Sequence, residues 1–385
     1  MSVPLPVTRL MSGLADKTDT PPVASAPAPA DTAAWLAQGR YVLRRPLAQG
    51  GMGRVYLVYD HELEREVALK VLLPEAGADP TMVATFVEEA RAVGQLEHPA
   101  ITPVYDLGVT PDDQLYFTMK YLNGETMADL ILRLREADGA LLETWSFSRR
   151  LELIVTVAEA LSFAHQRGVL HRDIKPSNIM VGPAGEVTVM DWGLAKRART
   201  VRAPMAGHET SITRRGEHAN LSEAVAGTPG YLAPEALESA SGFSPQSDVY
   251  SLGVVMHELF ALHPPFPELQ PMERQLRSMA EDPPFIDASR TAQGRVPREI
   301  AIIVSKAVRY DPQDRYASIE QMLDAIRQYQ RGEAPVVCVH TGLKRGVNRL
   351  SKLVDEHGHL VIVILAILLT TPLIILLMWW LSTRV

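Results

Sequence analysis

The chain has 385 residues, of which 46% are hydrophobic, and its formal net charge is −7. That length is enough for two or three domains, and no basic stripe interleaved with aromatic residues indicates nucleic-acid binding. The single cysteine, Cys338, excludes an internal disulfide framework and a cysteine-based zinc site, and we expect this thiol to be inert.

The first segment, residues 1–38, has little apolar surface to bury. Residues 21–30 read PPVASAPAPA, a composition typical of a disordered, extended arm. The segment also lacks the apolar core of a signal peptide. We therefore expect a Pro/Ala-rich arm at 1–38, ahead of the folded part.

A glycine-rich segment comes next, between two alternating apolar stretches. Residues 47–56 read LAQGGMGRVY, which predicts a strand, a turn and a second strand. Small residues allow backbone N–H groups to approach an anion such as phosphate. A hairpin of this kind is more often an ordinary turn, so it indicates a phosphate-binding loop only in combination with further motifs.

A further strand pattern, VALK at residues 67–70, ends on Lys70. An isolated lysine in this position is usually a solvated edge charge. Here the helical pattern TFVEEAR at residues 85–91 supplies candidate carboxylate partners. Later in the chain, long helical patterns such as residues 151–167 indicate a predominantly helical region.

Residues 171–193 read HRDIKPSNIMVGPAGEVTVMDWG and carry most of the functional information. Asp173 can accept the proton of an attacking hydroxyl, and Lys175 can neutralise charge on a moving phosphoryl group. Asn178 and Asp191 can hold magnesium. This set, at this spacing, is what phosphoryl transfer from Mg-ATP requires.

The motifs occur in the same order as in the eukaryotic-type (Hanks-type) serine/threonine protein kinases. Over roughly residues 41–331 the chain resembles a bacterial member of that family. Residues 227–235, GTPGYLAPE, add the A-P-E element of that family. The resemblance implies an α+β, bilobal protein-kinase fold. We expect a small β-rich N-lobe with one helix at 41–121 and a larger helical C-lobe at 122–331.

The resemblance also implies an ATP-binding set. Lys70 matches the lysine that contacts the α and β phosphates, with Glu89 as its partner and Glu88 as the runner-up. Gly50 and Gly53 match the glycine-rich pattern, although alanine replaces its first glycine and should make the loop slightly stiffer. The full set is Ala48, Gly50, Gly53, Val55, Ala68, Lys70, Glu89 and Asp129.

Within this set, Val55 and Ala68 would sandwich the adenine ring. Met119, outside the set, fits the gatekeeper position behind that ring. Asp129 either reaches the ribose or is an ordinary acidic residue at a helix N-terminus. Trp192 replaces the usual phenylalanine of D-F-G, and we expect it simply to be packed as an aromatic.

The resemblance makes Asp173 and Lys175 the catalytic residues, and Asn178 and Asp191 the Mg²⁺ ligands, with Mn²⁺ as an alternative ion. Lys175 and Thr228 favour serine or threonine of protein substrates as acceptors. Two further matches to the family pattern are structural. Asp248 would brace the catalytic loop, and Arg315 would pair with Glu235.

The segment from Asp191 to Glu235 is long and contains hydroxyl residues beside several basic ones, which suggests a phosphorylatable activation segment. Arg172 is the residue type that pairs with a loop phosphate in the family. We expect autophosphorylation, with self-association in trans between anchored neighbours. The candidate sites are Thr200, Thr210, Ser211, Thr213, Ser222 and Thr228.

Residues 360–381 are uncharged and mostly apolar, long enough to cross a bilayer as a helix, so we predict one transmembrane helix. The residues 382–385 would be a short external tail, giving a tail-anchored, single-pass protein. The segment 332–359 is a basic juxtamembrane linker that either lies on anionic lipid or is simply solvated. The positive-inside bias would keep the kinase part at the cytoplasmic face of the inner membrane.

We therefore expect an ATP-dependent serine/threonine protein kinase acting in membrane-anchored signalling. A pseudokinase scaffold is one alternative, for which Ala48 leaves some room but against which the complete catalytic set argues. A small-molecule kinase is another, but it would not need the sequence at residues 227–235.

Overall fold

The computed structural model describes residues 39–110, 112–136, 139–192, 196–197, 227–238, 242–286 and 296–333. Within this part the chain divides into two compact units. The first holds the residues up to Ala90 together with Pro103–Leu122, and the second holds Arg91–Thr102 and the residues from Asn123 onward. The predicted features outside the described residues are the arm at 1–38, the segments at 334–385 and the candidate sites Thr200, Thr210, Ser211, Thr213 and Ser222.

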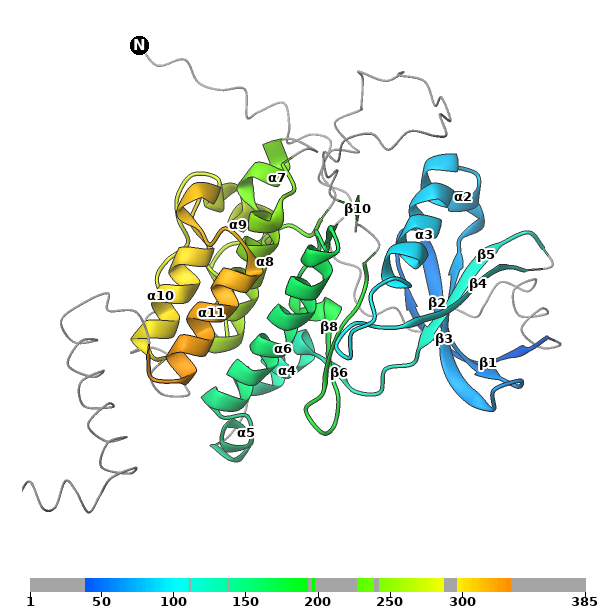
Figure 1. Ribbon diagram of the computed structural model, residues 1–385, viewed down its shortest axis with the longest axis horizontal. Coiled ribbons are helices and arrows are strands. Elements are labelled where there is room, and N and C mark those ends of the chain that lie inside the picture. Colours follow the sequence, from blue (N-terminus) through cyan, green and yellow to red (C-terminus); the bar gives the residue numbers. More distant parts are fainter. Residues whose placement is uncertain are drawn as a thin grey trace, which may run out of the picture. The chain divides into compact units, whose positions relative to one another are not determined.

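The first unit is built on a five-stranded antiparallel sheet with the strand order β1-β2-β3-β5-β4 (Figure 1). Its strands are β1 (Tyr41–Gln49), β2 (Gly53–Asp60), β3 (Arg65–Leu72), β4 (Val104–Val109) and β5 (Leu115–Lys120). Most neighbours in this order are also consecutive in the sequence, so short hairpins connect them. This is the β-rich lobe that the sequence predicts.

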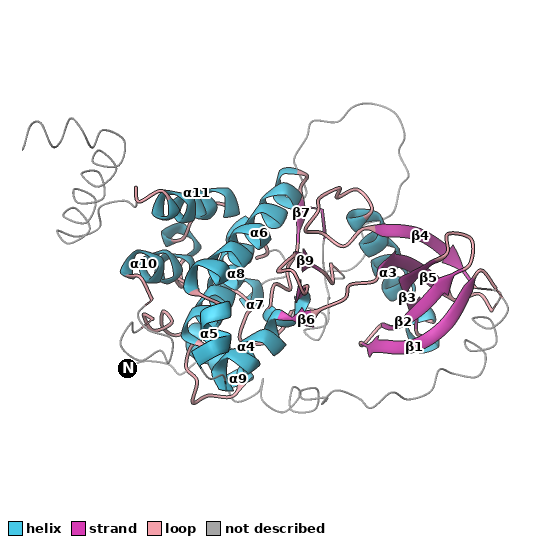
Figure 2. Cartoon of the chain, turned by 90° about the horizontal axis from the view of Figure 1, so that it is seen from below, coloured by secondary structure: helices cyan, strands magenta, loops and turns pink. Residues whose placement is uncertain are grey.

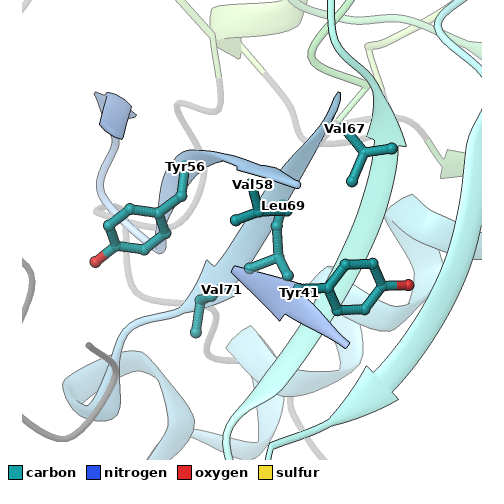
Figure 3. Close-up of a cluster of buried hydrophobic side chains, with 6 residues drawn as sticks. All are labelled: Tyr41, Tyr56, Val58, Val67, Leu69 and Val71. Carbon is teal, nitrogen blue, oxygen red and sulfur yellow. The ribbon is translucent and has the colours of Figure 1, made fainter. Parts of the chain in front are cut away.

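Alternation along β3 gives the sheet two different faces. On one face, Val67, Leu69 and Val71 pack with Tyr41, Tyr56 and Val58 in a buried apolar cluster (Figure 3). The opposite face carries Ala68, Lys70 and Leu72. Lys70 therefore lies on the face that does not build the cluster of Figure 3.

The second face is covered by helix α3 (Pro80–Val93), whose Phe86 and Ala90 pack against Leu72 and Phe117. The rings of Phe86 and Phe117 are 5.0 Å apart between centroids. The sequence predicts one helix here, whereas the structure has a second, α2 (Pro74–Gly77), of four residues. Proline at its first position favours such a turn, but four residues are too few to leave a periodic signal.

The second unit is mainly helical (Figure 2). Its longer helices are α4 (Met127–Glu136), α6 (Phe147–Gln166), α8 (Pro245–Ala261), α9 (Pro271–Ser278), α10 (Arg298–Ala307) and α11 (Ile319–Gln330). The short ones are α5 (Gly139–Thr144), α7 (Pro234–Glu238) and the 3-10 turns η2 (Pro176–Asn178) and η3 (Pro312–Asp314). The two-lobed kinase fold predicted from the sequence, with a sheet lobe and a helical lobe, is confirmed.

Two small sheets accompany these helices. One has the order β6-β8-β9, and the other pairs β10 with β7. The strands are β6 (Glu125–Thr126), β7 (Val169–Leu170), β8 (Ile179–Val181), β9 (Val187–Val189) and β10 (Lys196–Arg197). The antiparallel β8–β9 hairpin turns the chain back on itself, so the residues that precede β8 lie beside those that follow β9.

Helix α8 is the centre of the second unit and contacts α6, α10 and α11. Ser244 and Ser247 form a capping box at its start, and Pro245 occupies the first helical position. Nearly every residue of α8 is buried, including Asp248. Among the helices that the structure describes, none has the length and apolar character needed to cross a membrane.

Candidate active site

A buried ion pair joins β3 to α3 in the first unit. The Nζ atom of Lys70 lies 2.7 Å from Oε1 and 2.9 Å from Oε2 of Glu89, and both residues are buried. The ring of Phe117 lies beside the ammonium group, with its centroid 5.4 Å from Nζ. Glu88, the runner-up partner, is more exposed. Since an ammonium group has three N–H bonds, the pair with Glu89 does not exhaust the capacity of Lys70 to donate.

The strand register places two further residues of the predicted nucleotide set, and the predicted gatekeeper Met119, on the face of Lys70. Val55 on β2 is paired with Lys70, and Met119 on β5 is paired with Ala68. Directly paired residues project to the same side of a sheet, and Ala68 and Lys70 are two positions apart. All four side chains therefore share one face.

The glycine-rich segment forms the hairpin between β1 and β2. The N–H group of Gly50 donates to the carbonyl oxygen of Gly53 over 2.9 Å. A Cβ atom at Gly53 would lie 3.0 Å from the carbonyl oxygen of Val71, so this position favours glycine. Ala48 is paired with Val55 within the strands, without the positive φ that would require glycine. The substitution at the first glycine position is therefore compatible with a regular hairpin.

Asp129 lies in the first turn of helix α4 in the second unit. Its Oδ2 accepts hydrogen bonds from the hydroxyl and the N–H group of Thr126, at 2.6 and 3.3 Å. In return, the N–H group of Asp129 donates to the hydroxyl of Thr126 over 3.1 Å. This reciprocal arrangement is a helix cap. The cap gives Asp129 a local structural role, and its contact with the ribose stays a prediction.

Asp173 is the centre of a compact polar cluster in the second unit. Its Oδ1 accepts from the hydroxyl of Thr228 at 2.7 Å, and its Oδ2 lies 2.8 Å from Nζ of Lys175. The side-chain amide of Asn178 donates to Oδ2 at 3.0 Å and to the backbone oxygen of Asp173 at 2.8 Å. Lys175 also donates to the Thr228 hydroxyl over 2.6 Å. Residues 55 positions apart in the sequence therefore meet at one carboxylate.

The local fold brings these side chains together. The turn η2, which proline begins, returns the chain so that Asn178 lies next to Asp173. The β8–β9 hairpin then places Met190 beside Asn178, with an N–H to C=O hydrogen bond of 2.9 Å. Asp191 is the next residue, and it is exposed with a φ of 59°. A non-glycine residue with a positive φ is uncommon, and such residues often occur at functional sites.

Asp248 on helix α8 braces the backbone at His171 and Arg172, just before Asp173, as predicted. Its Oδ2 accepts from the backbone N–H of His171 at 2.9 Å, and its Oδ1 accepts from that of Arg172 at 3.0 Å. The Nε2 atom of His165 on α6 lies 2.7 Å from the same carboxylate. Arg172 has a φ of 70°, so these hydrogen bonds support a backbone conformation that would otherwise be strained.

Burial and neighbouring charges shift the pKa values of Asp173 and Asp248 in opposite directions. Burial alone would raise the pKa of Asp173, but the charge of Lys175 and the hydrogen bonds from Lys175 and Thr228 outweigh it, so the pKa lies below its ordinary value. For Asp248, burial is likewise outweighed, here mainly by His165, and its pKa is also lowered. Both groups are therefore ionised at neutral pH.

The donor set fits magnesium. Asn178 and Asp191 supply hard oxygen atoms, which Mg²⁺ prefers. Among the described residues, no group of three or more His, Cys, Asp or Glu side chains could form an all-protein metal site. Mg²⁺ in such sites is held by one or two carboxylates together with substrate phosphates, so a sparse donor set is what this ion needs.

Trp192 is 1% exposed and packs on His171, with ring centroids 4.5 Å apart. Its indole N–H also donates to the carbonyl oxygen of Val189, over a long 3.4 Å. The sequence-based expectation of a packed aromatic therefore holds. The hydrogen bond was not expected, because it depends on a backbone oxygen that the spacing does not reveal.

Glu235 and Arg315 form the predicted pair. The two guanidinium nitrogens Nη1 and Nη2 of Arg315 lie 2.7 and 2.8 Å from the two carboxylate oxygens of Glu235. Their separation of 80 positions means that only the family pattern could have paired them. The role of His165 was missed, because a histidine on a helix gives no signal for a partner on another helix.

Comparison with known proteins shows the family to which the chain belongs. The protein kinase domain model matches residues 41–326, and the chain therefore belongs to the protein kinase family. Serine/threonine-protein kinase PknD of Protochlamydia amoebophila is 33% identical over 306 residues, which cover 78% of this chain and 31% of that protein. PknB of Mycolicibacterium smegmatis is 36% identical over 299 residues, covering 77% of this chain and 44% of that protein.

The chain thus spans less than half of the length of these curated relatives. Among solved structures, the kinase domain of PknI from Mycobacterium tuberculosis matches with a TM-score of 0.52 and 27% sequence identity. That match covers 76% of this chain and 96% of the solved chain. The likeness therefore concerns the kinase domain.

Proposed function

We propose that this chain is an ATP-dependent protein kinase that transfers the γ-phosphoryl group to serine or threonine hydroxyls of proteins. The observation that carries the proposal is the cluster in which Lys175, Asn178 and Thr228 all bind Asp173. Membership in the protein kinase family and the names of the curated relatives support it.

In the proposed reaction, Asp173 orients the acceptor hydroxyl and accepts its proton. Lys175, which already lies at 2.8 Å from that carboxylate, neutralises charge on the transferred phosphoryl group. Lys70, fixed by Glu89, holds the nucleotide phosphates, and the glycine-rich hairpin offers them backbone N–H groups.

Asn178 and Asp191 would hold the magnesium ion, which neutralises charge on the phosphates when it is bound. Asn178 has its amide nitrogen directed to Asp173, so one side chain links the proposed metal site with the catalytic carboxylate. The proposed nucleotide contacts are completed by Ala48, Gly50, Gly53, Val55, Ala68 and Asp129.

We also propose that residues 227–233 receive the acceptor peptide. Thr228 in this segment donates its hydroxyl to Asp173 and accepts from Lys175, so the segment reaches the catalytic carboxylate directly. A kinase for small molecules would have no need of such a segment, whereas a protein acceptor needs a surface beside the reacting hydroxyl.

Transfer of radiolabelled phosphate from Mg-ATP to myelin basic protein tests the proposal. We expect the wild-type chain to label this acceptor and the Asp173→Asn variant to lose nearly all transfer. Asp324→Asn, at an exposed position of helix α11, is the matched control and should retain activity. Nucleotide binding by a wild-type chain that transfers no phosphate would instead favour a pseudokinase.

Regulation by autophosphorylation is part of the proposal. Thr228 is half-buried and its hydroxyl is bound to Asp173 and Lys175, whereas the candidates Thr200, Thr210, Ser211, Thr213 and Ser222 lie outside the described residues. After incubation with Mg-ATP, we expect mass spectrometry to find phosphate between residues 196 and 230. Dilution should slow the modification if the chains act on one another in trans.

We further propose that residues 360–381 anchor the protein in the inner membrane, with the kinase part in the cytoplasm. The support is the sequence alone: an uncharged, mostly apolar segment preceded by the basic linker at 332–359. The full chain should remain with the membrane fraction after a carbonate wash, and a chain ending at residue 333 should not. Recovery of the full chain in the soluble fraction would contradict the proposal.

A further inference from the structure

The backbone of residues 230–232 is held by one buried side-chain amide from helix α9. Oε1 of Gln275 accepts from the N–H group of Gly230 at 2.9 Å, and Nε2 of the same amide donates to the carbonyl oxygen of Leu232 at 2.9 Å. Gln275 is 2% exposed. A single amide thus satisfies a donor and an acceptor two residues apart, in the way that a neighbouring strand would.

Other contacts fix the residue that lies between these two. The carbonyl oxygen of Tyr231 accepts from the hydroxyl of Ser251 at 2.8 Å, and its phenol donates to Glu258 at 2.6 Å. Both partners belong to helix α8. Burial raises the pKa of Tyr231 well above its usual value, so the phenol stays protonated and remains a donor. The segment is therefore held from two helices.

The geometry of Gly230 explains why a helix side chain can reach the backbone here. Its φ is +91°, a conformation that favours glycine. A Cβ atom at this position would lie 3.7 Å from the backbone oxygen of Pro271 and from Nε of Arg274. The chain therefore runs directly over the first turn of α9, close enough for Gln275 to bind it.

We infer that Gln275 is a positioning residue for the protein acceptor, an inference that rests on the proposed function. The segment from Thr228 to Leu232 is bound at one end to Asp173 and at the other to Gln275. A shift at residues 230–232 would move the proposed acceptor surface and the hydroxyl of Thr228. The amide touches neither Lys70 nor the proposed metal ligands, so nucleotide binding should not depend on it.

Only a side chain with both a donor and an acceptor can make this pair of contacts. Gln275→Met keeps the length and volume and loses both hydrogen bonds. Gln275→Glu keeps the acceptor for Gly230 and loses the donor for Leu232. The exposed residue Gln313, changed to methionine, is the matched control.

Kinetics with myelin basic protein provide the first test. For Gln275→Met we expect the KM for the acceptor to rise about 5- to 30-fold, the range for one or two buried hydrogen bonds left unmade. Gln275→Glu should raise this KM at least as much, because it buries a carboxylate oxygen against the carbonyl oxygen of Leu232. The KM for ATP and the hydrolysis of ATP without acceptor should remain within about twofold of the wild type, a difference under about 0.5 kcal/mol.

Hydrogen exchange of the full chain provides a second test that does not require catalysis. In Gln275→Met, the amides of residues 227–238 should exchange about tenfold faster or more, because Gly230 has lost its acceptor. Gln313→Met should change neither exchange nor kinetics.

The inference is overturned if exchange in residues 227–238 is unchanged, or if the acceptor KM stays within about twofold of the wild type. It is also overturned if the KM for ATP rises in parallel with that for the acceptor, since the effect would then be a general loss of structure. A wild-type chain that transfers no phosphate would refute the proposed function, and exchange alone would then decide whether Gln275 holds the segment.

Discussion

Replacing Arg315 by methionine should strongly destabilise the second unit. The guanidinium group makes two hydrogen bonds to Glu235, at 2.7 and 2.8 Å, and three to the backbone oxygens of Arg309, Tyr310 and Gln246, at 2.6, 2.8 and 3.1 Å. Its side chain is 0% exposed. Methionine fills part of the space but leaves the carboxylate and the carbonyl groups without their donor.

Breaking a buried ion pair by removing one partner costs about 3–5 kcal/mol, because an uncompensated charge remains. We expect Arg315→Met to lower the free energy of unfolding by this amount. Arg315→Lys should retain only a part of this stabilisation, since an ammonium group cannot reproduce the planar guanidinium group that binds both carboxylate oxygens. Glu235→Gln should cost less, because the backbone contacts of Arg315 survive.

Urea unfolding followed by tryptophan fluorescence measures the effect, since Trp145 and Trp192 are both buried in this unit. Arg327→Met is the matched control. Arg327 also lies 2.7 Å from a carboxylate, that of Glu159, but these side chains are 43% and 39% exposed. We expect Arg327→Met to lower the free energy of unfolding by less than about 1 kcal/mol. If Arg315→Met and Arg327→Met lowered the free energy of unfolding equally, burial would not determine how much an ion pair contributes to stability. That result would refute the reasoning.

Three further predictions concern Lys70, Thr228 and His257. Lys70→Met should abolish most phosphate transfer to myelin basic protein, because it removes the ammonium group that Glu89 holds for the phosphates; transfer within about threefold of wild type, less than 1 kcal/mol, would contradict the role of Lys70. Thr228→Val should lower kcat about tenfold, the value of roughly one hydrogen bond at Asp173, whereas Thr228→Ser should retain activity; equal losses in the two variants would exclude the hydroxyl as the cause. Burial lowers the pKa of His257 to about 3, and neither ring nitrogen has a hydrogen-bond partner in the part of the chain that the structure describes. The unfolded state binds the proton near pH 6.5, so the free energy of unfolding should fall as the pH drops from about 6.5 toward 3, by at most about 1.4 kcal/mol per pH unit. Urea unfolding of His257→Leu should show a smaller fall, and an unchanged slope would contradict the assignment.

The order of the motifs was sufficient to predict the two-lobed fold and the groups that meet in each unit. Asp173, Lys175 and Asn178 are close in the sequence, so a single turn brings them together, and spacing alone carries that information. Lys70 and Glu89 are separated by 19 positions, and the sequence left Glu88 as an alternative. Burial decides between the two glutamates, and burial depends on which face of α3 packs on the sheet.

Gln275 and His165 could not have been predicted in the same way. Each acts through one or two hydrogen bonds to a partner 43 or more positions away, and Gln275 binds backbone groups, which every residue possesses. Neither residue interrupts the apolar period of its helix in a manner that indicates a function. For Asp129, the cap with Thr126 is a local role that its place near the start of a helix makes predictable, and its contact with the ribose stays a prediction.

In the reaction that we propose, the electrostatics around Asp173 favour orientation of the acceptor over strong general-base catalysis. Lys175 and Thr228 hold the pKa of this carboxyl below its usual value, and a more acidic group is a weaker base. Phosphoryl transfer requires mainly positioning and charge neutralisation, since the transition state is loose and charge collects on the phosphoryl oxygens. Lys175 lies 2.8 Å from Asp173 and lowers its basicity, and the same ammonium group would neutralise the charge on the phosphoryl oxygens. The cluster therefore combines a less basic, fixed Asp173 carboxylate with a nearby cation, which suits the positioning role that we propose for it.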